Sequence, residues 1–208
     1  MIIYKLGEFP YFNSINHILA ANIDKQKTTS MEKQTHFQNA LKFGLMMGGL
    51  LIVSGLVMYL AGMVDTETGK SGFLGTALSY VISIGALILG ISAYKKSNNN
   101  FLSLGDGVKQ GILIGLVGGL VSAIYTVIFF QFIEPDMLEN IRETAIQQAE
   151  DRGQINEDSE EMMSGIMNTF TSPLFFFFAT IIMKFFLGLF VGLITGAIMK
   201  NERPYEEA

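Results

Sequence analysis

Four long stretches of almost uninterrupted apolar residues dominate the chain, at 41–63, 73–94, 110–133 and 173–199. They contain no Asp, Glu or Arg, and their lysines are Lys42 and Lys184. Roughly 20 helical residues cross a bilayer core about 30 Å thick, so each stretch is long enough to span a membrane. A soluble bundle would instead show polar stripes at the helical period. The pattern therefore predicts an all-α fold, an integral membrane four-helix bundle.

The basic residues between these stretches predict the orientation. Four spans place both termini and the 95–109 loop on the same side of the membrane. That side carries most of the basic residues: Lys25, Lys27, Lys33, Lys42, Lys95, Lys96, Lys109, Lys200 and Arg203. The opposite side carries Lys70, Arg142 and Arg152. Because cytoplasmic loops are enriched in Lys and Arg, we expect the N- and C-termini to be cytoplasmic.

The first thirty residues differ from the rest of the chain. They lack the basic start and apolar core of a signal peptide, and they cannot span a membrane. Two interpretations stay open: a segment that is not native, with Met31 as the true start, or a flexible cytoplasmic tail or interfacial helix. We therefore divide the chain into a flexible extension at 1–30, a four-span membrane domain at 31–200 and a short cytoplasmic tail at 201–208.

The segment 134–172 predicts an extracytoplasmic acidic helical hairpin. Pro135 and Asp136 suit a first helical turn, the DRGQ sequence breaks the helix, and Asn156 can cap a second one. Its acids do not follow the spacing of a calcium loop. We therefore favour two amphipathic helices packed on each other and on the membrane surface over a partner-docking or cation-binding appendage.

Small residues recur at four-residue steps in three of the spans. Such spacing lets the backbones of membrane helices approach closely. The glycines predicted to pack helices together are Gly44 and Gly48 in the first span, Gly111, Gly115 and Gly119 in the third, and Gly188, Gly192 and Gly196 in the fourth. The third and fourth spans run in opposite directions with their glycines at the same depth, so we expect these two helices to contact each other.

The composition argues against several classes of function. The chain has no Cys, which excludes thiolate nucleophiles and Cys-ligated metals, and both histidines, His17 and His36, precede the first apolar stretch. A net charge of −5 argues against a nucleic-acid partner, since binding to the phosphate backbone needs a basic surface. We therefore predict no catalytic residues, no cofactor, no metal site and no enzymatic activity.

Lys184 is the one charge deep inside a predicted span. It lies roughly 22 Å from the cytoplasmic end, where a Lys costs on the order of 2.5–3.5 kcal/mol unless it is paired or hydrated. Because helical side chains tilt toward the helix N-terminus, we expect it to lean toward Gln131 and Glu134. The predicted intramembrane polar cluster comprises Lys184, Tyr80, Tyr125, Tyr59, Ser83, Gln131 and Glu134. Two interpretations stay open: a solute or proton site, or a side chain that extends to the interface and joins two spans.

The order of these features resembles the domain of unknown function 4199 family, uncharacterised four-span bacterial membrane proteins found mostly in Bacteroidota. The resemblance covers residues 31–200. It rests on ALKFGLMMG in the first span, YKKSNNNFLSLGDGVKQG before the third, FIEPDML after it, SP at 172–173 and GLFVGLITGAIMK at the end. It implies a bacterial cytoplasmic (inner) membrane location and supplies no catalytic residues, and Lys184 is not part of its pattern.

Two functions fit these observations. The first is a non-enzymatic scaffold or accessory subunit in the lipid bilayer, which associates through small-residue helix faces into a homo-oligomer or with another membrane protein. The alternative is an oligomeric small-solute or ion transporter or channel with a polar site around Lys184. A polar cavity that joins Lys184 to one face would favour the alternative, whereas dry packing would favour the scaffold.

Overall fold

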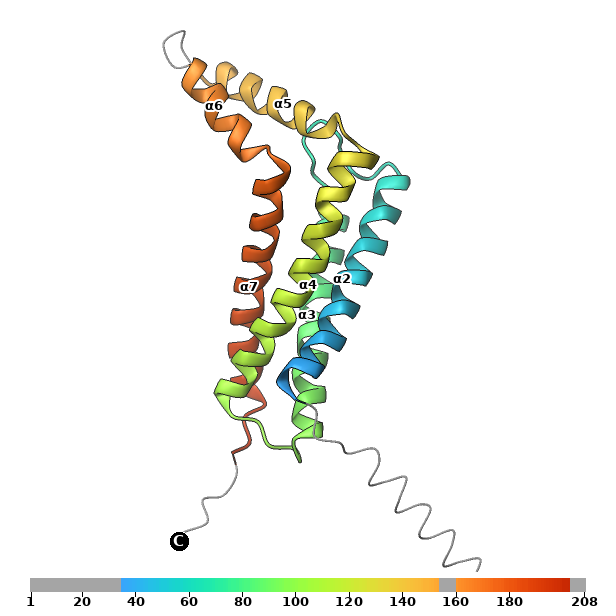
Figure 1. Cartoon of the computed structure of the whole chain (residues 1–208), viewed down its shortest axis with the longest axis vertical. Helices are drawn as coiled ribbons and strands as arrows, with labels where there is room; N and C mark the ends of the chain where they lie inside the picture. The colour runs from blue at the N-terminus through green and yellow to red at the C-terminus, as the bar shows by residue number, and fades with distance from the viewer. Residues whose placement is uncertain (1–34, 154–159, 203–208) are drawn as a thin grey trace, which may run out of the picture. The chain divides into compact units, whose positions relative to one another are not determined.

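The structure is a computed structural model that describes residues 35–153 and 160–202, so the predicted extension at 1–30 and the proposed cap at Asn156 lie outside the described residues. Figure 1 shows this part of the chain as a bundle of long helices with two shorter helices across one end. In chain order the elements are α2 (His36–Leu60), α3 (Phe73–Ser97), α4 (Leu104–Ile128) with its π-helical continuation η1 (Phe129–Ile133), α5 (Met137–Asp151), α6 (Glu160–Phe170) and α7 (Pro173–Ile198).

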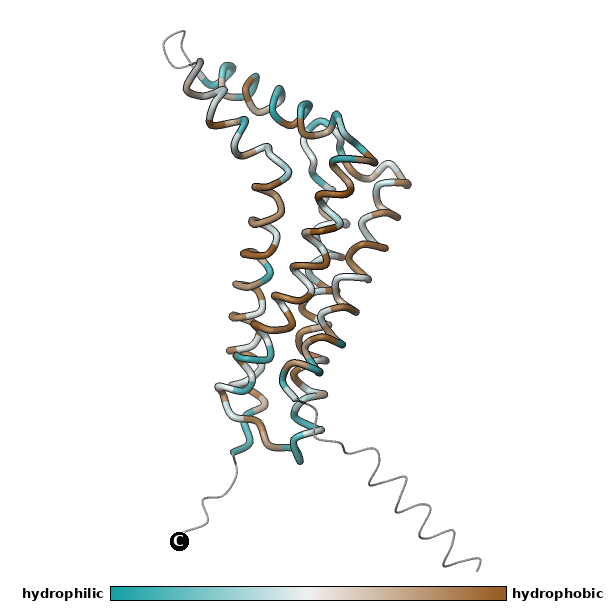
Figure 2. Tube along the Cα trace, viewed as in Figure 1, coloured by the Kyte–Doolittle hydropathy of each residue, from teal (hydrophilic) through white to brown (hydrophobic). Residues whose placement is uncertain are grey.

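Four of these helices, α2, α3, α4 with η1, and α7, are long and apolar enough to cross a membrane. Figure 2 shows hydrophobic residues along all four and hydrophilic residues toward both ends of the bundle. The prediction of an all-α, multi-pass membrane protein is therefore confirmed. We call the end that carries α5 and α6 the hairpin end, and the opposite end, with the turn at 98–103, the loop end.

Two of the spans begin earlier than predicted, because polar capping residues precede their apolar stretches. Thr35 accepts a hydrogen bond from the backbone N–H of Gln38, whose side chain bonds back to Thr35, so α2 begins at His36 rather than at 41. Ser103 forms the same reciprocal pair with Asp106, so α4 begins at Leu104 rather than at 110. Each capping box satisfies backbone donors at the helix start and adds a polar first turn to an apolar helix.

The helices α5 and α6 occupy the segment where we expected the acidic hairpin. Arg142 of α5 bonds Glu139 on its own helix and Asn168 on α6, which links the two helices. Met137 and Ala149 of α5 are buried, and Ile141 lies against Gly69 in the 61–72 loop. The hairpin thus packs on the loop that leads into α3.

The glycines of α4 and α7 form the closest helix contact of the bundle, which we call the glycine interface: Gly107, Gly111, Gly115 and Gly119 with Gly188, Gly192 and Gly196. A Cβ atom built on Gly111 would lie 2.2 Å from the carbonyl oxygen of Gly188, and one on Gly107 would lie 2.5 Å from the Cα of Gly196. Only glycine permits this approach of two backbones.

The helix α4 contacts all three other spans, most extensively α7 and then α2. Gly44 and Gly48 of α2 receive Val117 and Val121 of α4, and a Cβ on Gly44 would lie 2.5 Å from the Cβ of Val117. Toward the hairpin end, α7 diverges from α4 (Figure 1). The bundle is therefore closely packed at the loop end and less so at the hairpin end.

Candidate functional site: the Lys184 cleft

Lys184 lies where the glycine interface ends. It is about 16 Å from the start of α7 at 1.5 Å per residue, close to the middle of the membrane. A Cβ on Gly119 would lie 3.0 Å from the Cβ of Lys184, and one on Gly115 would lie 2.4 Å from its carbonyl oxygen. The backbone of Lys184 is thus fixed against α4, while its side chain extends toward α3.

The ammonium group of Lys184 donates a hydrogen bond of 2.8 Å to Oγ of Ser83, which is fully buried in α3. We expected Lys184 to lean toward Gln131 and Glu134, but the side chain turns across the bundle. Space between α3 and α7 explains the difference, because a long side chain can reach a polar partner there without passing through the packed glycine interface.

This space is a cleft of about 570 Å³, within the range of ligand pockets. We call it the Lys184 cleft. Its α3 side is lined by Ser71, Thr76, Ser79 and Tyr80, and its α7 side by Phe176, Ala179, Thr180, Met183, Lys184, Leu187 and Phe190. No carboxylate is among these lining residues, so the only formal charge in the cleft is the ammonium of Lys184.

The hydroxyl groups in the cleft are mostly committed as donors to their own helices. Thr76 donates to the carbonyl oxygen of Ser71, Ser79 to that of Gly75, and Ser83 to that of Ser79. Thr180 does the same on α7 with the carbonyl of Phe176. Their oxygens remain free to accept hydrogen bonds from water or from Lys184. Among the lining side chains, the donors left for a ligand are the remaining N–H groups of Lys184 and the hydroxyls of Ser71 and Tyr80.

The 61–72 loop at the hairpin end contributes Ser71 to the lining of the cleft. Asp65 accepts hydrogen bonds from the Thr68 hydroxyl and from the backbone N–H groups of Glu67 and Thr68, and these bonds lower the pKa of Asp65, the Thr68 hydroxyl contributing most. Gly69 has a positive φ of 69°, which closes the turn. An isolated bridge from Val64 to Ser71 then holds Ser71 at the start of α3.

The other residues of the predicted cluster lie elsewhere. The hydroxyl of Tyr59 bonds the carboxylate of Glu134, which joins α2 to the end of η1. Gln131 lines a separate groove of about 520 Å³ between α4 and α7. Tyr125 packs against Phe129, and its buried hydroxyl has no partner among the described residues. Of the seven residues, the structure thus pairs Tyr59 with Glu134, and it places Lys184, which bonds Ser83, in the same cleft as Tyr80.

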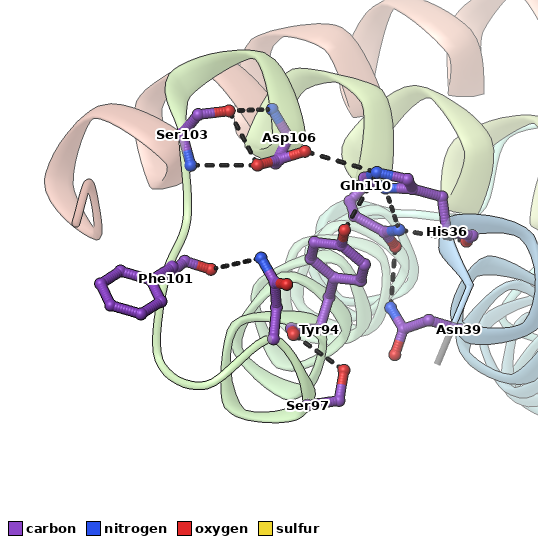
Figure 3. A network of polar contacts seen from close by, with 9 residues as sticks. His36, Asn39, Tyr94, Ser97, Phe101, Ser103, Asp106 and Gln110 are labelled. Atoms are coloured by element: carbon purple, nitrogen blue, oxygen red, sulfur yellow. Dashed lines mark hydrogen bonds and ion pairs between the residues drawn. The ribbon is translucent and has the colours of Figure 1, made fainter. Parts of the chain in front are cut away.

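A second polar group, which sequence reasoning missed, ties the helices at the loop end; we call it the loop-end cluster. Its members are His36 and Asn39 of α2, Tyr94 of α3, and Asp106 and Gln110 of α4 (Figure 3). Asn39 donates to the carbonyl oxygen of Gly90 at 2.9 Å and to the side-chain oxygen of Gln110 at 2.8 Å. Both side chains are fully buried.

The backbone carbonyl oxygens of Gly90 and His36 can only accept hydrogen bonds, so they determine which side-chain atoms of Asn39 and Gln110 are donors. Gln110 donates to the carbonyl oxygen of His36 at 3.1 Å, and the same nitrogen lies 2.9 Å from Nδ1 of His36. Nδ1 must therefore accept, so the proton of the neutral ring sits on Nε2, facing Asp106 at 3.3 Å and Tyr94 at 3.0 Å. The cluster joins α2, α3 and α4, and within the described residues the side-chain oxygen of Asn39 is the one side-chain atom of the cluster that is buried without a partner. We assign the cluster no ligand.

Two capping motifs were the signal that could have revealed this cluster. T-x-x-Q at 35–38 and S-x-x-D at 103–106 move the helix starts back and place His36, Asn39 and Asp106 within helices.

Comparisons with known proteins give a family without a described function. Residues 42–201 match the model of a family described as "Protein of unknown function (DUF4199)". No curated protein and no solved structure gave a significant match.

Proposed function

We propose that this chain, which belongs to the DUF4199 family of proteins of unknown function, is a non-enzymatic membrane protein. It binds an anionic ligand in the Lys184 cleft. The observation that carries this proposal is the partner of Lys184. A mid-membrane ammonium has a serine hydroxyl as its hydrogen-bond partner and faces a cleft without a carboxylate. An anion in this cleft would supply the missing charge.

The packing of the glycines also favours a binding site over a scaffold. Gly111, Gly115, Gly188 and Gly192 contact each other across α4 and α7, and Gly44 packs against α4. Helices of the same chain already cover these small-residue faces, so the faces are not available to a second subunit. A Cβ built on Gly49 or Gly55 of α2 would meet no side chain or neighbouring helix within 4 Å, so these glycines are open to a partner, and association through α2 is the second candidate function.

The basic residues support one orientation of this site. Lys42, Lys95, Lys96, Lys109 and Lys200 lie near the loop end, whereas Lys70, Arg142 and Arg152 lie in the loop and hairpin at the opposite end. We propose that the protein resides in the bacterial cytoplasmic membrane with the loop end in the cytoplasm. The cleft would then open toward the extracytoplasmic side.

The proposal can be tested by native mass spectrometry of the full chain purified in mild detergent. Wild-type protein should carry a non-covalently bound anionic molecule, and Lys184→Met should lose it. Lys109→Met, an exposed lysine outside the cleft, is the matched control and should keep the bound mass. An identical bound mass in Lys184→Met, or none in the wild type, would contradict the assignment.

A further inference from the structure

The two walls of the Lys184 cleft differ in chemistry. The α3 wall presents hydroxyl groups from Ser71, just before the start of α3, to Tyr80 within the helix. The α7 wall presents apolar side chains at all depths, and Leu187 and Phe190 extend it past Lys184 toward the loop end. From Phe176 to Phe190 the apolar wall is about 21 Å long at the helical rise. The cleft thus has a hydroxyl-lined side that ends at Tyr80 and an apolar side that continues past Lys184.

The side of the cleft is open between α3 and α7. Tyr80, Met183 and Phe190 line it and are 48%, 65% and 62% exposed. These residues lie within membrane spans, so their exposed surfaces face the hydrocarbon of the bilayer. A small hydrated anion at Lys184 would border hydrocarbon on one side, which is costly. A ligand with its own apolar chain avoids that cost.

From this geometry we infer that the ligand is a single-chain amphiphile with a carboxylate or phosphate head; the inference rests on the proposed anion-binding function. The head accepts hydrogen bonds from Lys184 and Tyr80, and the chain lies along Leu187 and Phe190. A lipid in the leaflet at the hairpin end already points its chain toward the middle of the membrane. If this lipid moves deeper along the hydroxyl groups that line the α3 wall, its head reaches Lys184 and its chain keeps the same direction.

Binding of defined probes tests the inference. The full chain in phosphatidylcholine nanodiscs is titrated with palmitate, hexadecyl phosphate, hexadecanol and butyrate, with empty nanodiscs measured in parallel. We expect saturable binding of palmitate or hexadecyl phosphate, and the preferred one identifies the head. Hexadecanol and butyrate should each bind at least about tenfold more weakly, because one lacks the charge and the other the chain.

Variants separate this inference from the proposed function. Lys184→Met should weaken palmitate or hexadecyl phosphate binding by about tenfold or more, and Lys109→Met should leave it unchanged. Butyrate binding that equals palmitate binding and depends on Lys184 would overturn the amphiphile inference and leave the anion site standing. Equal binding of palmitate and hexadecanol, or full binding by Lys184→Met, would overturn both. The comparison of the four probes on wild-type protein needs no variant, so it decides the chain-length question even if Lys184→Met misfolds.

Discussion

An ammonium group in the middle of a membrane helix needs a counter-charge or a polar environment. At Lys184 the environment is a hydroxyl partner, Ser83, and a cleft lined on one side by further hydroxyl groups. Glu134, which the sequence suggested as a partner, is bonded to Tyr59 instead. The unusual residue was therefore visible in the sequence, but its partner was not, because that choice depends on where α3 and α7 leave space.

The buried amides of the loop-end cluster allow a prediction at the same scale. Gln110→Leu removes the acceptor of Asn39 and the donor to His36, and it leaves buried polar groups without partners, each at a cost of about 1–3 kcal/mol. We expect the free energy of unfolding in detergent to fall by at least that amount, measured by denaturant titration with circular dichroism.

Gln131→Leu provides the matched control. Gln131 belongs to η1, which continues α4, and it is exposed. The same change there should alter the free energy of unfolding by less than about 0.5 kcal/mol. Equal losses for the two variants would show that the loop-end cluster does not stabilise the bundle.

At the level of elements, the apolar stretches predicted the four spans, since membrane insertion is a local property of about 20 residues. The four-residue glycine steps likewise predicted the contact between α4 and α7, because small residues at that spacing leave few alternatives. The divergence of α7 from α4 toward the hairpin end was not predictable. Beyond Gly119 large side chains take the place of glycine between the two helices, as where Phe130 of η1 packs against Phe176 of α7, and the spacing that results depends on how these rings pack.

The glycine interface gives a prediction for one substitution. In Gly111→Ala the new methyl group would meet the carbonyl oxygen of Gly188, so α4 and α7 must move apart. Such overpacking typically costs about 1–3 kcal/mol, and we expect a loss of that size in the free energy of unfolding, measured in the same detergent.

Gly85→Ala in α3 is the control, because no atom lies within 4 Å of its added Cβ. Alanine favours the helix over glycine, so this variant should be neutral or more stable by up to about 1 kcal/mol. The interface would not require glycine at position 111 if Gly111→Ala behaved like Gly85→Ala.

For the whole molecule, the two ends of the bundle differ in how they are closed. At the loop end, the glycine interface, the loop-end cluster and a bridge between Leu102 and Asn201 join the helices, and Lys95 donates to the carbonyl oxygen of Met199. At the hairpin end, the Lys184 cleft opens between α3 and α7. This asymmetry predicts a site that water reaches from the hairpin end and not from the loop end.

Thiol accessibility tests that claim most directly, because the chain has no Cys and every reaction reports an introduced one. Three single substitutions in α3 are compared in sealed vesicles with a charged, membrane-impermeant maleimide: Ser79→Cys in the cleft, Val81→Cys on the exposed lipid-facing side and Ala86→Cys in the buried core. The maleimide reacts with a hydrated thiolate, which hydrocarbon and a dry core both disfavour.

We predict that Ser79→Cys reacts when the reagent is applied at the hairpin end and not at the loop end, and that Val81→Cys and Ala86→Cys stay unmodified from either side. If Ser79→Cys is as unreactive as Ala86→Cys, the space around Lys184 is dry and closed, and the account of an open anion-binding cleft is wrong.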